Sequence, residues 1–293
     1  MQQEDLFQAY KPLLFSIAYN MLGSVMDAED CVQEALLRWY QASANGEMEA
    51  VRSPKSYLST IITHLCIDQL RSARVQRECY VGIWLPEPLV VVDESSVTGI
   101  AELSETLSLA FLRLLEQLSP VERAVFLLRQ VFDYEYAEIA AIVQKSEDNC
   151  RQIVRRARQH LGAHRPVYNA SKEQQDTILH QFIHACTNGD MDGLLALLTN
   201  DIVSYADSGG KVSAARNPIY GADRVARYIL GFVRKVPADY HFRVARINGQ
   251  PGIINYVNGA PFAIMTLDIL DGHIRELDTI VNPDKLRGIA ALS

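Results

Sequence analysis

The spacing of apolar residues changes once along this chain. Over roughly the first 165 residues they recur three and four positions apart, which is the period of an amphipathic helix. After Ser171 come two further helices, a loop at Gly209-Gly210, a helix at 222–233 and short strands at 240–247, 252–257, 261–270 and 273–281. The pairs Asn258-Gly259 and Asp271-Gly272 are strong hairpin signals, because both residues of each pair adopt positive φ readily. This order predicts an all-α N-terminal part and an α+β C-terminal part with a hairpin-linked antiparallel sheet.

Start and stop signals divide the first part into helices. Gly23 ends a helical pattern that begins at Leu6, and Ser24 precedes a second pattern that continues to about Gln41. Pro54 is suited to the first turn of a third helix, because the N–H that proline lacks has no partner there. The sequence therefore predicts three helices before residue 78.

The stretch 134–161 predicts two short helices with a tight break at Gln144-Lys145. Ser146 follows the break and is suited to cap the second helix. One face of that helix is apolar, and the other carries Asn149, Arg151, Gln152, Arg155, Arg156 and Arg158. A short helix, a turn and a second helix with such a face are typical of proteins that read the DNA major groove. The alternative is an ordinary solvent-exposed cationic helix of a bundle.

The distribution of charge favours DNA binding. The whole chain has 28 Lys+Arg and 35 Asp+Glu, a net charge of -7, which argues against a general nucleic-acid coat. Segment 145–171 is the exception, with six basic and two acidic residues. A local basic segment on an acidic chain indicates one defined contact with DNA.

Composition limits the class of protein further. A chain of 293 residues, 48% of them apolar, predicts a globular protein of two or three domains. We expect it to be cytoplasmic and without membrane contact, because it has neither an apolar run of membrane-span length nor a signal-peptide pattern at its acidic start. The five cysteines form no CxxC or zinc pattern, which predicts reduced thiols and no metal or cofactor.

Two blocks of sequence resemble one protein family. DAEDCVQEALLRWY at 27–40 and SPKSYLSTIITHLCIDQLRSAR at 53–74 resemble region 2 of the bacterial extracytoplasmic-function (ECF) RNA polymerase sigma factors. LSPVERAVFLLRQVFDYEYAEIAAIVQKSEDNCRQIVRRARQHL at 118–161 resembles region 4 of the same family. The blocks have the family's order and spacing. The resemblance implies a promoter-specificity subunit of RNA polymerase that is not an enzyme.

Three short motifs extend the resemblance beyond these blocks. WLPEP at 84–88 lies in a proline-containing segment with an acidic stretch around Asp93-Glu94, and it resembles the linker of sigma factors that carry an extra C-terminal domain. ADSGGKV at 206–212 and NPDKL at 282–286 resemble motifs of the same subgroup. The resemblance implies a SnoaL-like (NTF2-like) C-terminal fold, a curved sheet that helices close into a cone. The expected domains are region 2 at 1–78, the linker at 79–103, region 4 at 104–168 and the SnoaL-like domain at 172–293.

The resemblance to sigma factors also implies roles for individual residues. For binding the coiled coil of the polymerase β′ subunit it implies Asp27, Glu29, Asp30, Gln33 and Glu34, although helix capping alone would also explain acidic residues at 27–30. For the −10 element, where an unstacked base is captured, it implies Lys55, Ser56, Tyr57, Arg71 and Arg74. For the −35 duplex it implies Ser146, Asn149, Arg151, Gln152, Arg155 and Arg156. Region 4 is also expected to contact the β flap of the polymerase.

The subgroup motifs imply regulation in cis by the C-terminal domain. The residues concerned are Trp84, Leu85 and Pro86 in the linker and Asp207, Gly209, Gly210, Lys211, Asn282, Pro283, Asp284 and Lys285 in the C-terminal domain. We expect the ADSGGKV loop to pack against the linker or the sigma domains and to favour a compact arrangement that opens for polymerase.

Other functions of the C-terminal domain are compatible with the same sequence. The cone is an alternative site for an unknown small-molecule ligand, as in a sensor. A residual isomerase-like enzyme using Asp207 and Tyr205 is another alternative. A helix-turn-helix repressor that works without polymerase is a third.

Two residues depart from the family's region 4 pattern. Gln144 stands where the family has glycine, so a left-handed turn there is expected to be strained. Asp148 stands where a small apolar residue is usual, close to a DNA phosphate. Its charge is expected either to weaken DNA binding or to favour the N-terminus of the helix.

Overall fold

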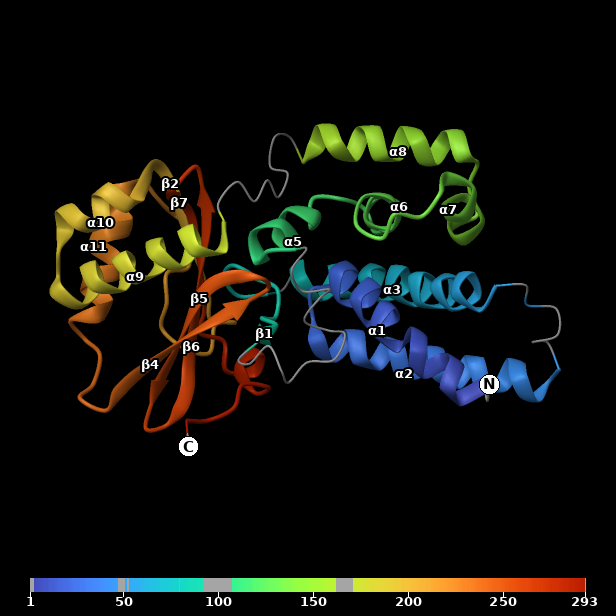
Figure 1. Ribbon diagram of the computed structural model, residues 1–293, viewed down its shortest axis with the longest axis horizontal. Helices are drawn as coiled ribbons and strands as arrows, with labels where there is room; N and C mark the ends of the chain where they lie inside the picture. Colours follow the sequence, from blue (N-terminus) through green and yellow to red (C-terminus); the bar gives the residue numbers. More distant parts are fainter. Residues whose placement is uncertain are drawn as a thin grey trace. The chain divides into compact units, whose positions relative to one another are not determined.

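The computed structural model describes residues 3–46, 51, 53–78, 80–91, 107–161 and 171–292 (Figure 1). It divides into two compact units. The first contains the described residues up to 78 and those at 112–161, and the second contains those at 80–91, 107–111 and 171–292. The acidic stretch at Asp93-Glu94 and the expected end of region 4, beyond residue 161, lie outside the described residues.

Three helices form the N-terminal part of the first unit: α1 (Gln3–Leu22), α2 (Val25–Ala44) and α3 (Pro54–Glu78). The predicted end of α1 and the predicted starts of α2 and α3 are confirmed. Gly23 ends α1 at a φ of 67°, the Ser24 hydroxyl accepts the N–H of Asp27 at 3.2 Å, and Pro54 begins α3. The Trp39 indole is completely buried between these helices. Local signals therefore set the helix ends, and burial of the apolar faces holds the helices together.

Four shorter helices follow within the described residues 107–161: α5 (Leu109–Leu115), α6 (Pro120–Gln130), α7 (Tyr136–Val143) and α8 (Glu147–His160). Helix α6 begins with a capping box, in which the side chains of Ser119 and Glu122 each accept the other residue's backbone N–H. Within the first unit, α6 packs against α1. The buried Arg123 guanidinium donates to the Met21 carbonyl at 2.6 Å and to the Glu116 carboxylate at 2.8 Å. These bonds satisfy a charge that would be costly to bury alone.

The second unit combines helices with a sheet in which seven strands are described. The helices are α9 (Lys172–Asn188), α10 (Met191–Leu197), α11 (Ala222–Val233) and the short 3-10 helix η2 (Pro283–Leu286). The strands are β1 (Val90–Val91), β2 (Leu198–Asp207), β3 (Ile219–Tyr220), β4 (Tyr240–Ile247), β5 (Gln250–Val257), β6 (Ala260–Leu270) and β7 (His273–Ile280), in the spatial order β1-β4-β5-β6-β7-β2-β3. A helical first unit and an α+β second unit confirm the predicted fold class.

Asn-Gly or Asp-Gly pairs connect the antiparallel strands β4 to β7. The two predicted hairpins are confirmed, with φ of 51° and 73° at Asn258-Gly259 and of 49° and 80° at Asp271-Gly272. Asn248-Gly249, with φ of 51° and 71°, makes a third turn of the same kind between β4 and β5. Two successive residues at positive φ give the twist that a tight hairpin needs.

The sheet is mixed, so the expectation of a wholly antiparallel sheet is wrong. Strands β2 and β7 run parallel, from Val203 beside Glu276 to Asp207 beside Ile280. Turn signals specify only consecutive strands, whereas α11 and several strands separate β2 from β7 in the sequence. The two-residue strands β1 and β3 were also missed, because such short segments show no alternation of apolar and polar residues.

The two faces of the sheet are covered by different parts of the second unit. Adjacent residues of a strand point to opposite faces. Ile253 of β5 belongs to the apolar cluster beneath α9, α10 and α11, whereas Ile254 belongs to a second cluster. That second cluster includes Leu85 of the linker, Leu109 of α5 and Leu286 of η2, and Leu85 is completely buried. The linker is therefore part of the hydrophobic core of this unit.

The described part of the chain also bears on membrane and metal sites. None of its helices is long and apolar enough to cross a bilayer. It contains no group of three or more His, Cys, Asp or Glu arranged to hold a metal ion. Its cysteines, Cys31, Cys66, Cys150 and Cys186, are free thiols, and Cys79 lies outside it.

Candidate DNA-binding and linker-binding sites

The helix-turn-helix consists of α7 and α8. Gln144 joins them in the left-handed conformation, with φ 53° and ψ 50°, and the N–H of Lys145 donates to the Ala140 carbonyl at 3.0 Å. The Ser146 hydroxyl caps α8 by accepting the N–H of Asn149 at 3.3 Å. The predicted break, the predicted cap and the left-handed turn at Gln144 are confirmed. A residue other than glycine costs about 1–2 kcal/mol in this conformation.

One face of α8 is buried and the opposite face is exposed. Cys150, Ile153, Val154 and Ala157 form the buried face. Of the residues expected at the −35 element, Ser146, Arg151, Gln152, Arg155 and Arg156 are exposed and Asn149 is half-buried. The neighbouring Arg158 is exposed too, and it donates to Gln130 Oε1 at 2.6 Å. The polar side chains of α8 thus face solvent, as a helix that enters a DNA groove requires.

Arg151 is held by its neighbours on the helix-turn-helix. Its guanidinium contacts the Glu147 carboxylate at 2.9 Å and the Asp148 carboxylate at 3.2 Å. It also lies over the Tyr136 ring, 4.9 Å from the centroid. Asp148, one of the two departures from the family pattern, therefore forms an ion pair with an adjacent arginine. This pairing reduces the positive potential at the start of α8.

Helix α2 carries the acidic residues that the resemblance assigns to polymerase binding. Glu29, Asp30 and Gln33 are exposed, whereas Asp27 and Glu34 are half-buried. Asp27 accepts a hydrogen bond from Gln69 Nε2 at 3.3 Å, and Glu34 accepts one from Arg38 Nε at 2.9 Å. Glu29, Asp30 and Gln33 are therefore the exposed members of this set.

The same face of α2 exposes large apolar residues that the sequence analysis missed. Met26, Leu37 and Tyr40 are 59%, 56% and 39% exposed. Together with Asp30 and Gln33 they recur at intervals of three and four, so they form one stripe along the helix. This spacing is visible in the sequence, and a search of the polar face for apolar residues would have found it. Leu37 and Tyr40 are neighbours at one end of this stripe, and exposed apolar neighbours of this kind are typical of protein–protein contacts.

The residues expected at the −10 element lie on α3. Lys55 is exposed, and Ser56 and Tyr57 are half-buried, with the Tyr57 ring 6.1 Å from the Trp39 ring. Arg71 is exposed and pairs with Asp68 at 3.1 Å. Arg74 belongs to α3, and its side chain lies outside the described part of the structure.

Tyr134, just before α7, lies against α3 within the first unit. Its hydroxyl is 2.6 Å from Ser59 Oγ, and the residue is only 2% exposed. Lys55 Nζ lies 4.6 Å from the centroid of the Tyr134 ring, and His64 Nε2 is 2.7 Å from the Ile142 carbonyl oxygen. Burial raises the pKa of the Tyr134 phenol, so the side chain stays neutral. Part of the α3 surface expected at the −10 element is therefore in contact with the helix-turn-helix.

Asp207, at the end of β2, binds the linker inside the second unit. Its carboxylate is completely buried. Oδ2 accepts the N–H of Leu85 at 2.9 Å and pairs with Lys285 Nζ at 2.6 Å. Oδ1 accepts the Tyr80 hydroxyl at 2.5 Å and the N–H of Gly209 at 3.0 Å. These donors compensate for the loss of water that burial of a carboxylate entails.

Lys285 of η2 holds the same segment of linker. Its ammonium donates to the Leu85 carbonyl and lies 4.4 Å from the centroid of the Trp84 ring. Asn282 Nδ2 donates to the Tyr80 hydroxyl oxygen at 2.9 Å. Burial, together with the hydrogen bond to Asp207, raises the pKa of Tyr80. The three sequence motifs thus meet in one place, and we refer to Tyr80, Leu85, Asp207, Asn282 and Lys285 as the linker-binding cluster.

Two glycines allow the close approach of chain segments around this cluster. Gly209 and Gly210 have φ of 56° and 72°. A Cβ at Gly209 would lie 2.6 Å from Asn282 Nδ2, and a Cβ at Gly210 would lie 2.8 Å from the Val81 Cβ. Any other residue would therefore push the loop away from the linker and the tail.

The remaining motif residues support the cluster from its edge. Lys211 forms an ion pair with Asp284, and the Lys211 ammonium lowers the pKa of that carboxyl group. Asn282 caps η2 by accepting the N–H of Asp284 at 3.1 Å, and Pro283 begins the helix. The NPDKL motif is thus a compact turn that presents Asn282 and Lys285 to the linker.

The three linker residues named from the sequence are buried to different degrees. Leu85 is completely buried and Pro86 is buried beside it, whereas Trp84 is half-buried. Tyr80 was not singled out, because one tyrosine in an irregular segment gives no periodic signal. Its partners, Asp207 and Asn282, could be found only from the fold.

The geometry of Asp207 also bears on the isomerase-like alternative. Both carboxylate oxygens accept hydrogen bonds within the linker-binding cluster, and the side chain is completely buried. Tyr205 packs against the apolar cluster that contains Leu85. This arrangement leaves neither carboxylate oxygen available to take a proton from a substrate.

Comparison with known proteins decides the family. Residues 6–75 match Sigma-70 region 2, and residues 108–161 match Sigma-70, region 4. The chain is 34% identical to the ECF RNA polymerase sigma factor SigJ of Mycobacterium tuberculosis, over 96% of this chain and 92% of that protein. This protein belongs to the ECF RNA polymerase sigma factors. It is also 30% identical to the probable ECF RNA polymerase sigma factor SigI of the same organism, over 99% of this chain and 98% of that one.

A solved structure of the family extends the likeness to the C-terminal domain of this ECF sigma factor. The crystal structure of Mycobacterium tuberculosis SigJ matches it with a TM-score of 0.78 and 31% identity, over 96% of this chain and 97% of that one. The predicted family and the predicted NTF2-like C-terminal fold are confirmed. The protein acts in promoter-directed transcription by RNA polymerase, and its near relatives are sigma factors, which are not enzymes. Family membership therefore favours a sigma factor over a repressor that works alone.

Proposed function

We propose that the C-terminal domain regulates this sigma factor in cis by holding the linker between regions 2 and 4 through the linker-binding cluster. Residues 80–91 of the linker belong to the same compact unit as that domain. A linker that is fixed along part of its length limits the separation and orientation of the segments it joins. Release of the linker shifts the population toward arrangements in which both regions reach polymerase and promoter.

The observation that carries the proposal is the placement of the Leu85 backbone between two buried charges. Asp207 accepts the Leu85 N–H, Lys285 donates to the Leu85 carbonyl, and the two charges pair at 2.6 Å. Both members of this ion pair belong to the C-terminal domain, so release of Leu85 breaks two hydrogen bonds to charged groups rather than the pair itself. A hydrogen bond to a charged group contributes about 1.5–3 kcal/mol. These two bonds, together with burial of the Leu85 side chain, hold the linker until polymerase or another event displaces it.

Contacts inside the first unit support a closed resting arrangement. Tyr134 is buried against Ser59, and Lys55 lies over its ring. In this arrangement Tyr134 contacts Lys55, one of the residues assigned to the −10 element. Capture of an unstacked base by Lys55, Ser56 and Tyr57 would then require Tyr134 to leave α3, which links promoter opening to separation of regions 2 and 4.

Polymerase binding is assigned to α2 and to region 4. The carboxylates of α2 would meet basic residues of the β′ coiled coil, while Met26, Leu37 and Tyr40 would supply apolar contact on the same stripe. Region 4 would contact the β flap. Charge complementarity would speed the encounter, and the apolar side chains would slow dissociation.

Promoter recognition is assigned to α3 and α8. Arg71 and Arg74 would track phosphates beside the melted −10 element. The exposed Arg151, Gln152, Arg155 and Arg156 of α8, together with the half-buried Asn149, would read base edges or phosphates of the −35 duplex. Ser146 would lie at the phosphate end of the helix.

Transcription reconstituted with core polymerase tests the regulatory proposal. The full chain is compared with a chain that ends at residue 168 and with Asp207→Asn. We expect both to change promoter-dependent output in the same direction, by about fivefold or more, because both release the linker. Asp201→Asn is the matched control, since Asp201 lies on the same strand but is exposed. Unchanged output from both the truncated chain and Asp207→Asn would rule the proposal out.

A further inference from the structure

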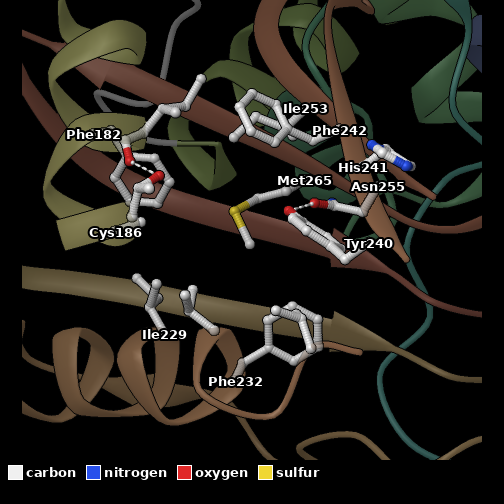
Figure 2. Close-up of a pocket in the computed structure, with 14 residues that line it drawn as sticks. Phe182, Cys186, Ile229, Phe232, Tyr240, His241, Phe242, Ile253, Asn255 and Met265 are labelled. Carbon is white, nitrogen blue, oxygen red and sulfur yellow. Dashed lines mark hydrogen bonds between the residues drawn. The ribbon is translucent and has the colours of Figure 1, made fainter. Parts of the chain in front are cut away.

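The second unit contains a cavity of about 400 Å³ that the linker-binding cluster does not use (Figure 2). It lies between the helices and the sheet. Its walls come from α9, from α11 and the turn after it, and from β4, β5 and β6. Asp207 and Lys285 are not among the described residues that line it. The cavity is therefore separate from the regulatory contact proposed above.

The walls of the cavity are mainly apolar and carry little charge. No Asp, Glu, Lys or Arg occurs among the described lining residues. Burial raises the pKa of the Cys186 thiol to about 12, so this group is neutral as well. Apart from the exposed imidazole of His241, the walls offer no partner of opposite charge to a charged ligand, which would lose its hydration here. The chemistry of the walls selects a neutral, largely apolar molecule.

Aromatic side chains gather at one end of the cavity. The Phe232 and Phe262 rings stack with centroids 6.1 Å apart, and Tyr240 meets Phe262 edge to face at 6.3 Å. Phe232 and Phe242 line the cavity and yet are 36% and 44% exposed. Flat aromatic walls of this kind favour a ligand that contains rings. The two exposed phenylalanines also mark an entrance to the cavity, where a bound ligand would shield their apolar surface from water.

One polar pair faces this apolar space. The Tyr240 hydroxyl donates to Asn255 Oδ1 at 2.7 Å (Figure 2), and Asn255 Nδ2 donates to the Ala263 carbonyl at 3.3 Å. Asn255 is only 4% exposed, and burial raises the pKa of Tyr240, which keeps the phenol protonated. Because the Tyr240 proton is engaged by Asn255, the phenol oxygen is left as an acceptor. A hydroxyl group on a ligand is the complementary donor.

The geometry points to a binding site for a neutral, ring-containing small molecule with a hydroxyl group, which donates to the Tyr240 oxygen while its rings fill the space around Met265. In Figure 2 the Met265 side chain extends into the space between Phe182 and Cys186 on one side and the Tyr240–Asn255 pair on the other. A flexible thioether can adapt to rings of different shape. Ring area would supply most of the affinity, and the single hydrogen bond would orient the molecule.

Two uncharged probes with the same rings, one with a hydroxyl donor and one with a methyl ether in its place, test this site on the full chain. The probes are 2-naphthol and 2-methoxynaphthalene, titrated by fluorescence or calorimetry. We expect saturable binding of both, with 2-naphthol tighter by about two- to tenfold, which is the worth of one hydrogen bond. Tyr240→Phe should abolish this difference while leaving the ether's affinity unchanged. Tyr220→Phe is the matched control, because Tyr220 is 59% exposed and does not line the cavity.

A second variant tests whether the probes bind inside the cavity, and a charged probe tests its preference for neutral ligands. Met265→Trp fills the centre of the cavity and should remove binding of both uncharged probes, while an unchanged thermal transition would show that the domain still folds. The anion 2-naphthoate should bind more weakly than either uncharged probe. The inference is overturned if neither uncharged probe saturates the wild-type chain, or if Tyr240→Phe and Met265→Trp bind both as the wild type does. Neither result depends on polymerase, so this test is independent of the proposed regulation in cis.

Discussion

The Asp207 carboxylate accepts the backbone N–H of Leu85 at 2.9 Å, although the two residues lie 122 positions apart in the sequence. The bond joins the end of strand β2 to the WLPEP segment of the linker. Because it is made to the backbone, replacing the Leu85 side chain does not remove it. The buried Leu85 side chain adds an apolar contact on the same residue. The polar and apolar contributions can therefore be measured separately.

Asp207→Asn tests the polar contribution. The amide retains one acceptor oxygen and leaves the Lys285 ammonium without its buried partner, 2.6 Å away in the wild type. We expect the free energy of unfolding of the second unit to fall by about 3 kcal/mol or more. We also expect faster proteolysis within residues 80–91. Urea unfolding and limited proteolysis measure the two effects, with Asp201→Asn as control, and equal stability of the two variants would show that the charge pair contributes nothing.

Leu85→Ala tests the apolar contribution. The side chain is completely buried among Ile247, Ile254 and Leu286. Truncation should leave a cavity and lower the free energy of unfolding by about 2–5 kcal/mol. Val81→Ala is the control in the same segment, because Val81 is 53% exposed and should change stability by less than about 0.5 kcal/mol. Comparable losses from both variants would mean that Leu85 is not a specific contact.

Gln144→Gly should stabilise the first unit. Gln144 has a φ of 53° at the C-terminus of α7, where a side chain is strained. Glycine removes this strain but gains entropy in the unfolded chain, so we expect a net increase of about 0.5–1 kcal/mol in the free energy of unfolding. The adjacent Lys145 is not at positive φ, and Lys145→Gly should be destabilising instead. If the turn is strained, the midpoint temperature of thermal unfolding should rise in Gln144→Gly and fall in Lys145→Gly. Changes of the same sign in both variants would contradict this account.

Features that depend on neighbouring residues were predictable from the sequence. Ser24, Pro54 and Ser146 stand at the helix starts they indicate, because a cap or a first-turn proline acts within a few residues. The hairpins at Asn258-Gly259 and Asp271-Gly272 were predictable for the same reason, because two adjacent residues determine each turn. The left-handed turn at Gln144 was expected from the family's glycine at that position, because glutamine itself gives no such local signal.

Features that depend on the whole fold were not predictable in the same way. No tight turn connects β2 to β7, so the sequence gives no local signal for their parallel pairing. Burial of Tyr134 against Ser59 requires that α3 and the helix-turn-helix pack together, which neither segment shows by itself. The motifs at 84–88, 206–212 and 282–286 could be named from the resemblance, but the role of Tyr80 between Asp207 and Asn282 required coordinates.

Asp148→Asn should strengthen promoter binding. Asp148 is 90% exposed and pairs with Arg151 on the face of α8 assigned to the −35 element. Asparagine keeps the size of the side chain and removes a negative charge that would face DNA phosphates. We expect promoter-dependent transcription at limiting sigma factor to rise by about two- to fivefold at low salt, the range of an exposed charge pair. Because salt screens exposed charges, the gain should shrink as ionic strength increases.

The control for this charge removal is Asp192→Asn. Asp192 is likewise an exposed aspartate in the first turn of a helix, but it lies on α10 of the C-terminal domain. It should leave promoter binding unchanged while costing similar helix stability, since acidic residues in a first turn interact with the helix dipole. If Asp148→Asn weakens transcription instead, the carboxylate must orient Arg151 for the promoter. The favourable effect of that orientation would then exceed the repulsion between Asp148 and phosphate.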